Sequence, residues 1–150
     1  MNWSDPNENI SKYFKVKEAL FLPKWGIFHQ PNESEQMAIS LMAERMDIIR
    51  EYIEKPIIVL SWIRPDHVNC PGSEYHLCDY NDLVNGAPSS MHIYGSAVDW
   101  YCSDSCDIVR FNIQFKLEQW GIRMERLPMS NWIHVDNKTV SQGMQRYFIP

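Results

Sequence analysis

Apolar and polar positions alternate with helical spacing between Asn32 and Glu54. The run Asn32-Glu-Ser-Glu35 has the form of a capping box, in which the asparagine side chain accepts a hydrogen bond from an unpaired backbone amide of the first turn. We expect the helix to end near Glu54, because Pro56 disfavours helical backbone in the residue before it. The apolar positions expected to face the core are Ala38, Leu41, Met42, Met46, Ile49 and Ile53.

Four apolar runs predict strands. The first, Ile57 to Trp62, is continuous and largely β-branched, which is typical of a buried strand. The second is Ala97 to Tyr101, and the last two, Ile122 to Leu127 and Asn131 to Asp136, are joined through Pro128.

Shorter patterns predict the remaining elements. Glu18 to Leu22 forms a turn or short helix, and the aromatic side chains between Trp25 and Phe28 are expected to dock on the core. Residues 65–89 form a long loop, whose length in a small domain favours a functional role. A further helix begins after Asp104 or Ser105 and ends before Gly121. Its expected apolar contacts are Ile108, Phe111, Phe115 and either Leu117 or Trp120. The tail residues Tyr147, Phe148 and Ile149 are expected to pack on the domain.

The order of these elements predicts an α+β fold, with helices packed on a small antiparallel sheet. Residues 1–10 are expected to be a polar lead-in to a single domain at 11–150, since 150 residues suit one domain. We expect a monomer.

The formal charge of −5 opposes a nucleic-acid binder and gives no support for docking on an anionic membrane. Met1 to Asn9 lack the basic and apolar regions of a secretory signal, and no apolar run is long enough to span a bilayer. We therefore expect synthesis in the cytoplasm.

The four cysteines are loosely spaced, with seven residues between Cys70 and Cys78 and three between Cys102 and Cys106. Structural zinc sites usually begin with tighter pairs. Buried or free thiols are the favoured interpretation, and a bridge from Cys70 to Cys78 remains open.

Candidate chemistry lies in the stretch from Ser90 to Asp99, where His92 and Asp99 are seven residues apart. Imidazole and carboxylate groups both bind zinc, and a catalytic zinc commonly takes three protein ligands and a water. The best third ligand is His134, on the last predicted strand. The hypothesis is a zinc hydrolase, in which Gly95 allows a close backbone turn. Ser90 could orient His92 by a hydrogen bond to the second ring nitrogen or to nearby backbone.

Residues two apart on a strand point to the same face, so Trp132, His134 and Asp136 share one face. Asp136 could orient a ligand histidine or accept a proton from the attacking water. Arg64, at the end of the first strand, is a candidate to stabilise an oxyanion.

The other histidines lack partners at ligand spacing. His29, His67 and His76 each lie in a predicted loop, where surface or packing roles are favoured over metal binding.

The decapeptide Ser90-x-His92-x-x-Gly95-x-Ala97-x-Asp99 resembles the signature of the zinc D-alanyl-D-alanine peptidase family, whose fold is shared with hedgehog signalling domains. Three other segments are similar in order and spacing to those of the family, and the likeness spans about residues 11–137. These are Ser61-Trp-Ile-Arg64 followed by Asn69, Trp132-Ile-His134-Val-Asp136, and Ser11-Lys-Tyr-Phe14 followed by Glu18, which is similar to the small phage-associated branch.

The resemblance implies a hedgehog/D,D-peptidase-like fold and one zinc ion bound by His92, Asp99 and His134, with Arg64 assisting the tetrahedral intermediate. It implies peptidoglycan stem peptides as substrate, which we expect Ser90 and Trp132 to contact. Several members are phage lysins without signal peptides, so an endolysin-type endopeptidase that reaches the cell wall by release or virion delivery is expected.

One position departs from the family pattern. Many members have Glu or Asp three residues before the last histidine as general base, and here Asn131 stands there. Asp136 or Glu125 could take that role, or the protein could be a catalytically impaired zinc-bound structural or wall-binding module of a virion. A D,D-carboxypeptidase is a further alternative.

Overall fold

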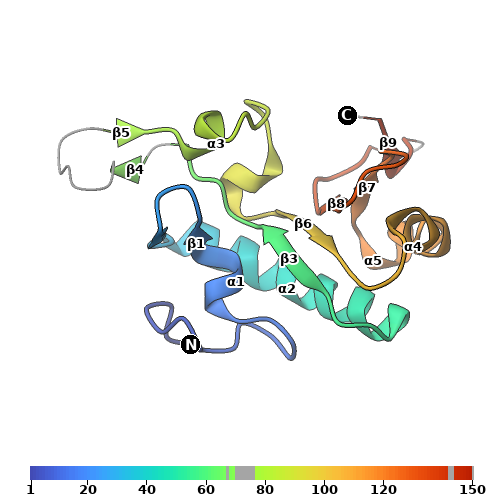
Figure 1. The fold of residues 1–150 in the computed structure, drawn as a ribbon, viewed down its shortest axis with the longest axis horizontal. Helices are drawn as coiled ribbons and strands as arrows, with labels where there is room; N and C mark the ends of the chain where they lie inside the picture. Colours follow the sequence, from blue (N-terminus) through green and yellow to red (C-terminus); the bar gives the residue numbers. More distant parts are fainter. Residues whose placement is uncertain (67, 70–76, 142–143, 150) are drawn as a thin grey trace.

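A mixed sheet of five strands, in the order β3-β6-β8-β7-β9, forms the centre of the computed structural model, and helices pack around it (Figure 1). The structure describes residues 1–66, 68–69, 77–141 and 144–149. All neighbouring strands are antiparallel except β7 and β9, which are parallel. The predicted α+β class is confirmed, and the sheet is mixed where a purely antiparallel one was expected. The strands are β3 (Ile58–Ser61), β6 (Ala97–Tyr101), β7 (Arg123–Glu125), β8 (Ile133–Asp136) and β9 (Tyr147–Phe148).

Two small hairpins accompany the sheet. One pairs β1 (Phe21–Leu22) with β2 (Ile27–Phe28), and the other pairs β4 (Val68–Asn69) with β5 (Leu77–Cys78) inside the segment predicted as loop. The helices are α1 (Val16–Leu20), α2 (Glu33–Ile53), α3 (Tyr80–Leu83), the 3-10 helix η1 (Met91–Tyr94), α4 (Cys106–Ile113) and α5 (Leu117–Trp120).

Helix α2 begins at the predicted capping box. The Asn32 side-chain oxygen accepts a hydrogen bond from the backbone N–H of Glu35 at 3.0 Å. The Glu35 carboxylate in turn accepts one from the backbone N–H of Asn32 at 2.8 Å. The helix ends at Glu54, whose φ is 55°. The predicted core stripe is displaced, because Leu41 is 44% exposed. The buried positions are Ile39, Met42, Ala43, Met46 and Ile49.

Strand β3 lies at the edge of the sheet, and the prediction of a fully buried strand is wrong. Ile58 and Leu60 point outward and are about half exposed. Side chains alternate between the two faces of a strand, and the face that carries Val59 packs against the core while that of Ile58 and Leu60 is open.

Several predicted apolar contacts also differ. Ile108, Phe111 and Phe115 are exposed, because α4 and α5 turn other residues to the core: Val109, Ile113, Leu117 and Trp120. Near β2, Trp25 packs edge-on against Tyr80, whereas Ile27 and Phe28 are exposed. In the tail, Tyr147 packs on the core and Ile149 is exposed.

The two faces of the sheet differ in character. Val98, Trp100, Ile133 and Val135 are fully buried in the hydrophobic core. Helix α2 contributes to the same core and crosses behind β3 and β6 (Figure 1). Because side chains alternate along a strand, the intervening residues of β6 and β8 point to the opposite face. That face carries the candidate site.

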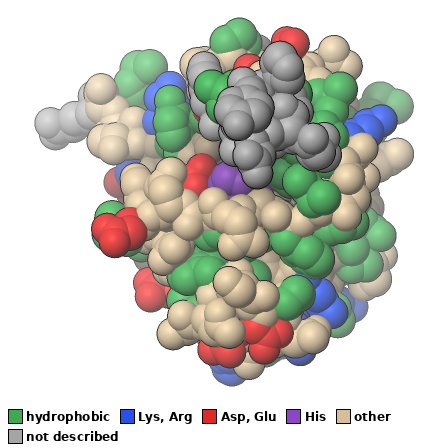
Figure 2. Space-filling view, turned by 90° about the vertical axis from the view of Figure 1, so that its left-hand side faces the viewer, with side chains coloured by type: hydrophobic (Ala, Val, Ile, Leu, Met, Phe, Trp, Pro, Cys, Tyr) green, Lys and Arg blue, Asp and Glu red, His purple; other side chains and the backbone are tan. Residues whose placement is uncertain are grey.

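Lys and Arg side chains lie at scattered positions on the face shown in Figure 2 and form no continuous basic surface among its described residues. Within the described part of the chain, no helix has the length and apolarity needed to cross a membrane.

The cysteines fall into two groups. Cys102 and Cys106 are free thiols, as favoured. Cys78 is disulfide-bonded, so the free-thiol interpretation is wrong for it. Cys70, the other residue of the candidate bridge, lies outside the described residues, as do His67 and His76.

Candidate metal centre

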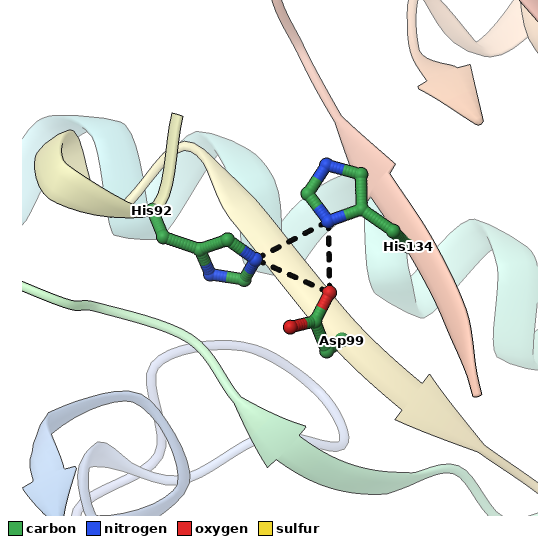
Figure 3. A group of neighbouring side chains, drawn as sticks. All are labelled: His92, Asp99 and His134. Atoms are coloured by element: carbon green, nitrogen blue, oxygen red, sulfur yellow. Dashed lines mark hydrogen bonds and ion pairs between the residues drawn. The ribbon is translucent and has the colours of Figure 1, made fainter. Parts of the chain in front are cut away.

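Three side chains from separate elements converge on the polar face of the sheet (Figure 3). His92 lies in η1, Asp99 on β6 and His134 on β8. The antiparallel register places Asp99 directly opposite His134. The Ser90 side chain caps η1 by accepting a hydrogen bond from the His92 amide at 3.3 Å. The sheet thus aligns two of the groups, and the short helix before β6 supplies the third.

The facing atoms form a small triangle. Nε2 of His92 lies 3.2 Å from Oδ1 of Asp99 and 3.2 Å from Nδ1 of His134. Nδ1 of His134 lies 2.8 Å from the same Asp99 oxygen. Bonds of the usual length in a tetrahedral zinc site separate neighbouring ligand atoms by about 3.3 Å. Two nitrogens and one oxygen at these separations fit a zinc ion with only small adjustments.

Each histidine has a partner on its other ring nitrogen. Nδ1 of His92 lies 2.5 Å from the backbone carbonyl of Trp62, which can only accept a hydrogen bond. The proton therefore lies on Nδ1, and Nε2 presents its lone pair to the triangle. Nε2 of His134 lies 3.4 Å from the Asp136 carboxylate. Contacts of this kind hold metal-binding histidines in the required tautomer and orientation.

Asp136 is fully engaged by other groups. Arg123 on β7 binds both carboxylate oxygens, at 2.8 Å and 2.6 Å, and the Lys138 amide donates to one of them at 2.9 Å. The side chain of Asp136 is 1% exposed. The sequence left two roles open for Asp136, orienting a ligand histidine or accepting a proton from water, and these contacts favour the first.

Gly95 explains one fixed position of the decapeptide. Its φ is +73°, and a Cβ there would lie 2.6 Å from Cγ1 of Ile39 on α2. A side chain would therefore be strained by the backbone conformation and would collide with the helix. Glycine allows the segment between His92 and Asp99 to turn while pressed against α2.

A cavity of about 440 Å³ opens over the triangle. Its wall includes Arg64, Ser90 and Trp132, and it also includes Glu125 on β7. The Arg64 guanidinium lies 3.6 Å from the Asp99 carboxylate, and Trp132 is 40% exposed. All predicted site residues except the fully buried His92 thus line one space, which is large enough for part of a peptide.

The charges of the metal-free site follow from its contacts. Burial lowers the pKa of His92, which is therefore neutral. Although burial opposes it, the hydrogen bond and the charge of His134 hold the pKa of Asp99 well below its usual range. Burial also lowers the pKa of His134, but hydrogen bonds to Asp136 and Asp99 outweigh it and raise the value to about 9. The carboxylate is thus ready to bind a cation, whereas His134 must first lose a proton.

The family model described as Peptidase M15 matches residues 12–136, which include all three residues of the triangle. The chain belongs to the peptidase M15 family. This confirms the resemblance to zinc D-alanyl-D-alanine peptidases and makes the protein a peptidase of a zinc-dependent family. No curated protein and no solved structure matched it.

Other candidates lie apart from this centre. His29 is buried, and its Nε2 lies within hydrogen-bond distance of the Glu35 carboxylate, at 3.0 Å. It therefore packs at the start of α2 in the peptidase. Sequence reasoning missed Arg123, although pairing the last two predicted strands would have placed it opposite Asp136. It expected Phe148 to pack on the domain but did not place it at the site, where its ring contacts that of His134 edge-on.

Proposed function

We propose that this peptidase is a zinc-dependent hydrolase of peptide bonds in bacterial peptidoglycan stem peptides or cross-links, of the endolysin type. The observation that carries the proposal is the convergence of His92, Asp99 and His134 below an open cavity. The peptidoglycan substrate is supported by the specific decapeptide between Ser90 and Asp99.

His92, Asp99 and His134 would hold the ion through Nε2, a carboxylate oxygen and Nδ1. A bound zinc ion supplies acidification of a water and polarisation of the scissile carbonyl. Trp62 and Asp136 keep the two rings in place through their outer nitrogens. These contacts fix the ligand atoms before the ion arrives, which reduces the reorganisation that binding requires.

Arg64 is suited to stabilise negative charge on the substrate. Its side chain is 17% exposed, and its buried Nε has no hydrogen-bond partner within the described part of the chain. Among the residues that the structure describes, its guanidinium forms an ion pair only with Asp99, at 3.6 Å, so it can turn toward a carbonyl oxygen in the cavity. Donors aimed at developing charge in a site that excludes water lower the barrier strongly.

Trp132 and Ser90 supply the proposed substrate contacts. The exposed indole of Trp132 offers a flat apolar surface at the cavity wall. The Ser90 oxygen accepts a hydrogen bond from the backbone N–H of His92, so the Ser90 O–H can donate to a substrate carbonyl. Lys138, exposed on the same wall, can attract the carboxylates of a stem peptide.

The test is digestion of purified peptidoglycan by the zinc-loaded protein, with mass spectrometry of the released fragments. We expect cross-link or stem-peptide cleavage that a chelator abolishes, and about one zinc per chain. His92→Ala should lose most of the zinc and the activity, because one of three ligands is gone. His29→Ala is the matched control, since it removes a buried histidine outside the site, and it should keep both.

Two results would replace the proposal. Release of free D-alanine alone would identify a D,D-carboxypeptidase. Stoichiometric zinc with no cleavage would identify a structural or wall-binding module.

A further inference from the structure

The family's usual position for the general base does not reach the cavity here. Asn131 stands three residues before His134, and its amide cannot accept a proton from water. Its side chain is exposed and lines a separate depression with Tyr101 and Cys106. Replacing it by an acid would therefore not bring a carboxylate to the metal centre.

Asp136 is also a poor acceptor. Arg123 occupies both of its oxygens, and the remaining contacts go to the Lys138 amide and His134. Both of its oxygens are thus engaged, whereas a general base needs an oxygen that is free to reach the attacking water.

Glu125 occupies the remaining acidic position on the same face. On β7 and β8, Arg123 pairs with Asp136 and Met124 with Val135. Continued by one residue, this register sets Glu125 opposite His134, which itself pairs with Asp99. The three side chains therefore form a row across adjacent strands, with the Cβ atoms of opposed residues about 4.5–5.5 Å apart.

The surroundings of Glu125 suit proton transfer. It is partly buried and lines the cavity with Arg64 and Trp132. Among the described residues, no hydrogen bond or ion pair engages its carboxylate. Burial raises its pKa. The charges of His134 and Arg64 oppose that effect, and the nearby carboxylates of Asp99 and Asp136 add to it. Glu125 is therefore a partly buried acid beside three groups that fit a metal, and no contact within the described ranges gives it a structural role.

We propose that Glu125 accepts a proton from the attacking water and later delivers it to the leaving amine. This rests on the proposed function. One O–H bond of water breaks as its oxygen bonds to the scissile carbonyl carbon, and the proton passes to the Glu125 carboxylate. The C–N bond then breaks, and the proton passes from Glu125 to the nitrogen, so the enzyme returns to its starting state.

The experiment compares zinc-loaded wild type with Glu125→Gln, which keeps the shape and removes the base. We expect kcat on peptidoglycan peptides to fall by about 100-fold or more, with KM and zinc content nearly unchanged. Calorimetry supplies a second measurement, in which a phosphinate dipeptide that mimics the tetrahedral state should bind about tenfold more weakly. The intact peptide should bind the variant as it binds the wild type.

Two variants make the comparison specific. Asn131→Ala should retain wild-type turnover, and adding Asn131→Asp to Glu125→Gln should restore nothing. A Glu125→Gln variant that cleaves near the wild-type rate, or is rescued by Asn131→Asp, overturns this inference alone. A zinc-loaded wild type that cleaves nothing overturns the proposed function, and this inference falls with it.

Discussion

Trp62 binds the His92 segment at two points. Its backbone carbonyl accepts from Nδ1 of His92 at 2.5 Å, and its indole Nε1 donates to the Gly95 carbonyl at 3.0 Å. One residue beyond β3 thus sets both the tautomer of a ligand histidine and the position of the turn that follows it.

Replacing Trp62 by phenylalanine tests the second contact. The buried Gly95 carbonyl would lose its donor, so we expect the free energy of unfolding to fall by about 1–3 kcal/mol. Urea denaturation of the metal-free protein measures the change. Zinc stoichiometry should remain near one, because the Trp62 carbonyl is kept. Full stability in the variant would show that the indole contact contributes nothing.

Gly95→Ala tests the close approach to α2. The left-handed backbone costs about 1–2 kcal/mol for a residue with a Cβ, and overpacking against Ile39 adds about 1–3 kcal/mol. Gly26→Ala is the matched control, since Gly26 has φ +66° but nothing within 4 Å of an added Cβ. In the same urea denaturation, we expect Gly26→Ala to lower the free energy of unfolding only by the backbone contribution. Equal losses would contradict the collision with Ile39.

Zinc uptake should release a proton from His134. In the metal-free protein the pKa of His134 is raised to about 9, so the ring is protonated at pH 7 and its Nδ1 carries a proton that the metal must displace. His92 is already neutral and Asp99 already ionised. The apparent affinity should therefore rise about tenfold per pH unit from 7 toward 9 and then level off.

Calorimetric zinc titrations in buffers of different ionisation enthalpy count the protons released. The expected result at pH 7 is about one proton per ion. Uptake that is independent of pH across this range would show that His134 is neutral before the metal binds.

Asp136→Asn tests the orienting role. We expect zinc affinity to fall by about 10- to 100-fold, because the partner of His134 Nε2 is weakened. Asp107→Asn is the control, since Asp107 pairs with the buried Arg110 outside the cavity at 2.8 Å. Unchanged zinc affinity with a large loss of turnover would instead give Asp136 the proton-transfer role. Competition with a chromophoric chelator measures both affinities.

The sequence allowed the site to be predicted more fully than its surroundings. The decapeptide and the alternation around His134 identified the three converging residues, because metal chemistry restricts which side chains can be used. The capping box at Asn32 located α2 for a similar reason, since few residues can satisfy its free amides.

Burial was harder to predict. The apolar run in β3 looks the same in an edge strand as in a central one, and only the sheet order distinguishes them. Phe111 and Phe115 also fit a helical stripe, yet α4 turns Val109 and Ile113 inward. The two-residue strands β4 and β9 are too short for any period to show.

Asp99, His134 and Glu125 form a row across three neighbouring strands. The pairing of the strand backbones therefore sets the distance from the proposed base to the metal ligands. Hydrogen bonding holds neighbouring strands about 4.8 Å apart whatever the connecting loops contain. The segment 126–132 between β7 and β8 can therefore vary in length or composition without moving the acid relative to the ligands. A slip of β7 by a single residue would do the opposite, turning Glu125 into the core and Met124 into the cavity.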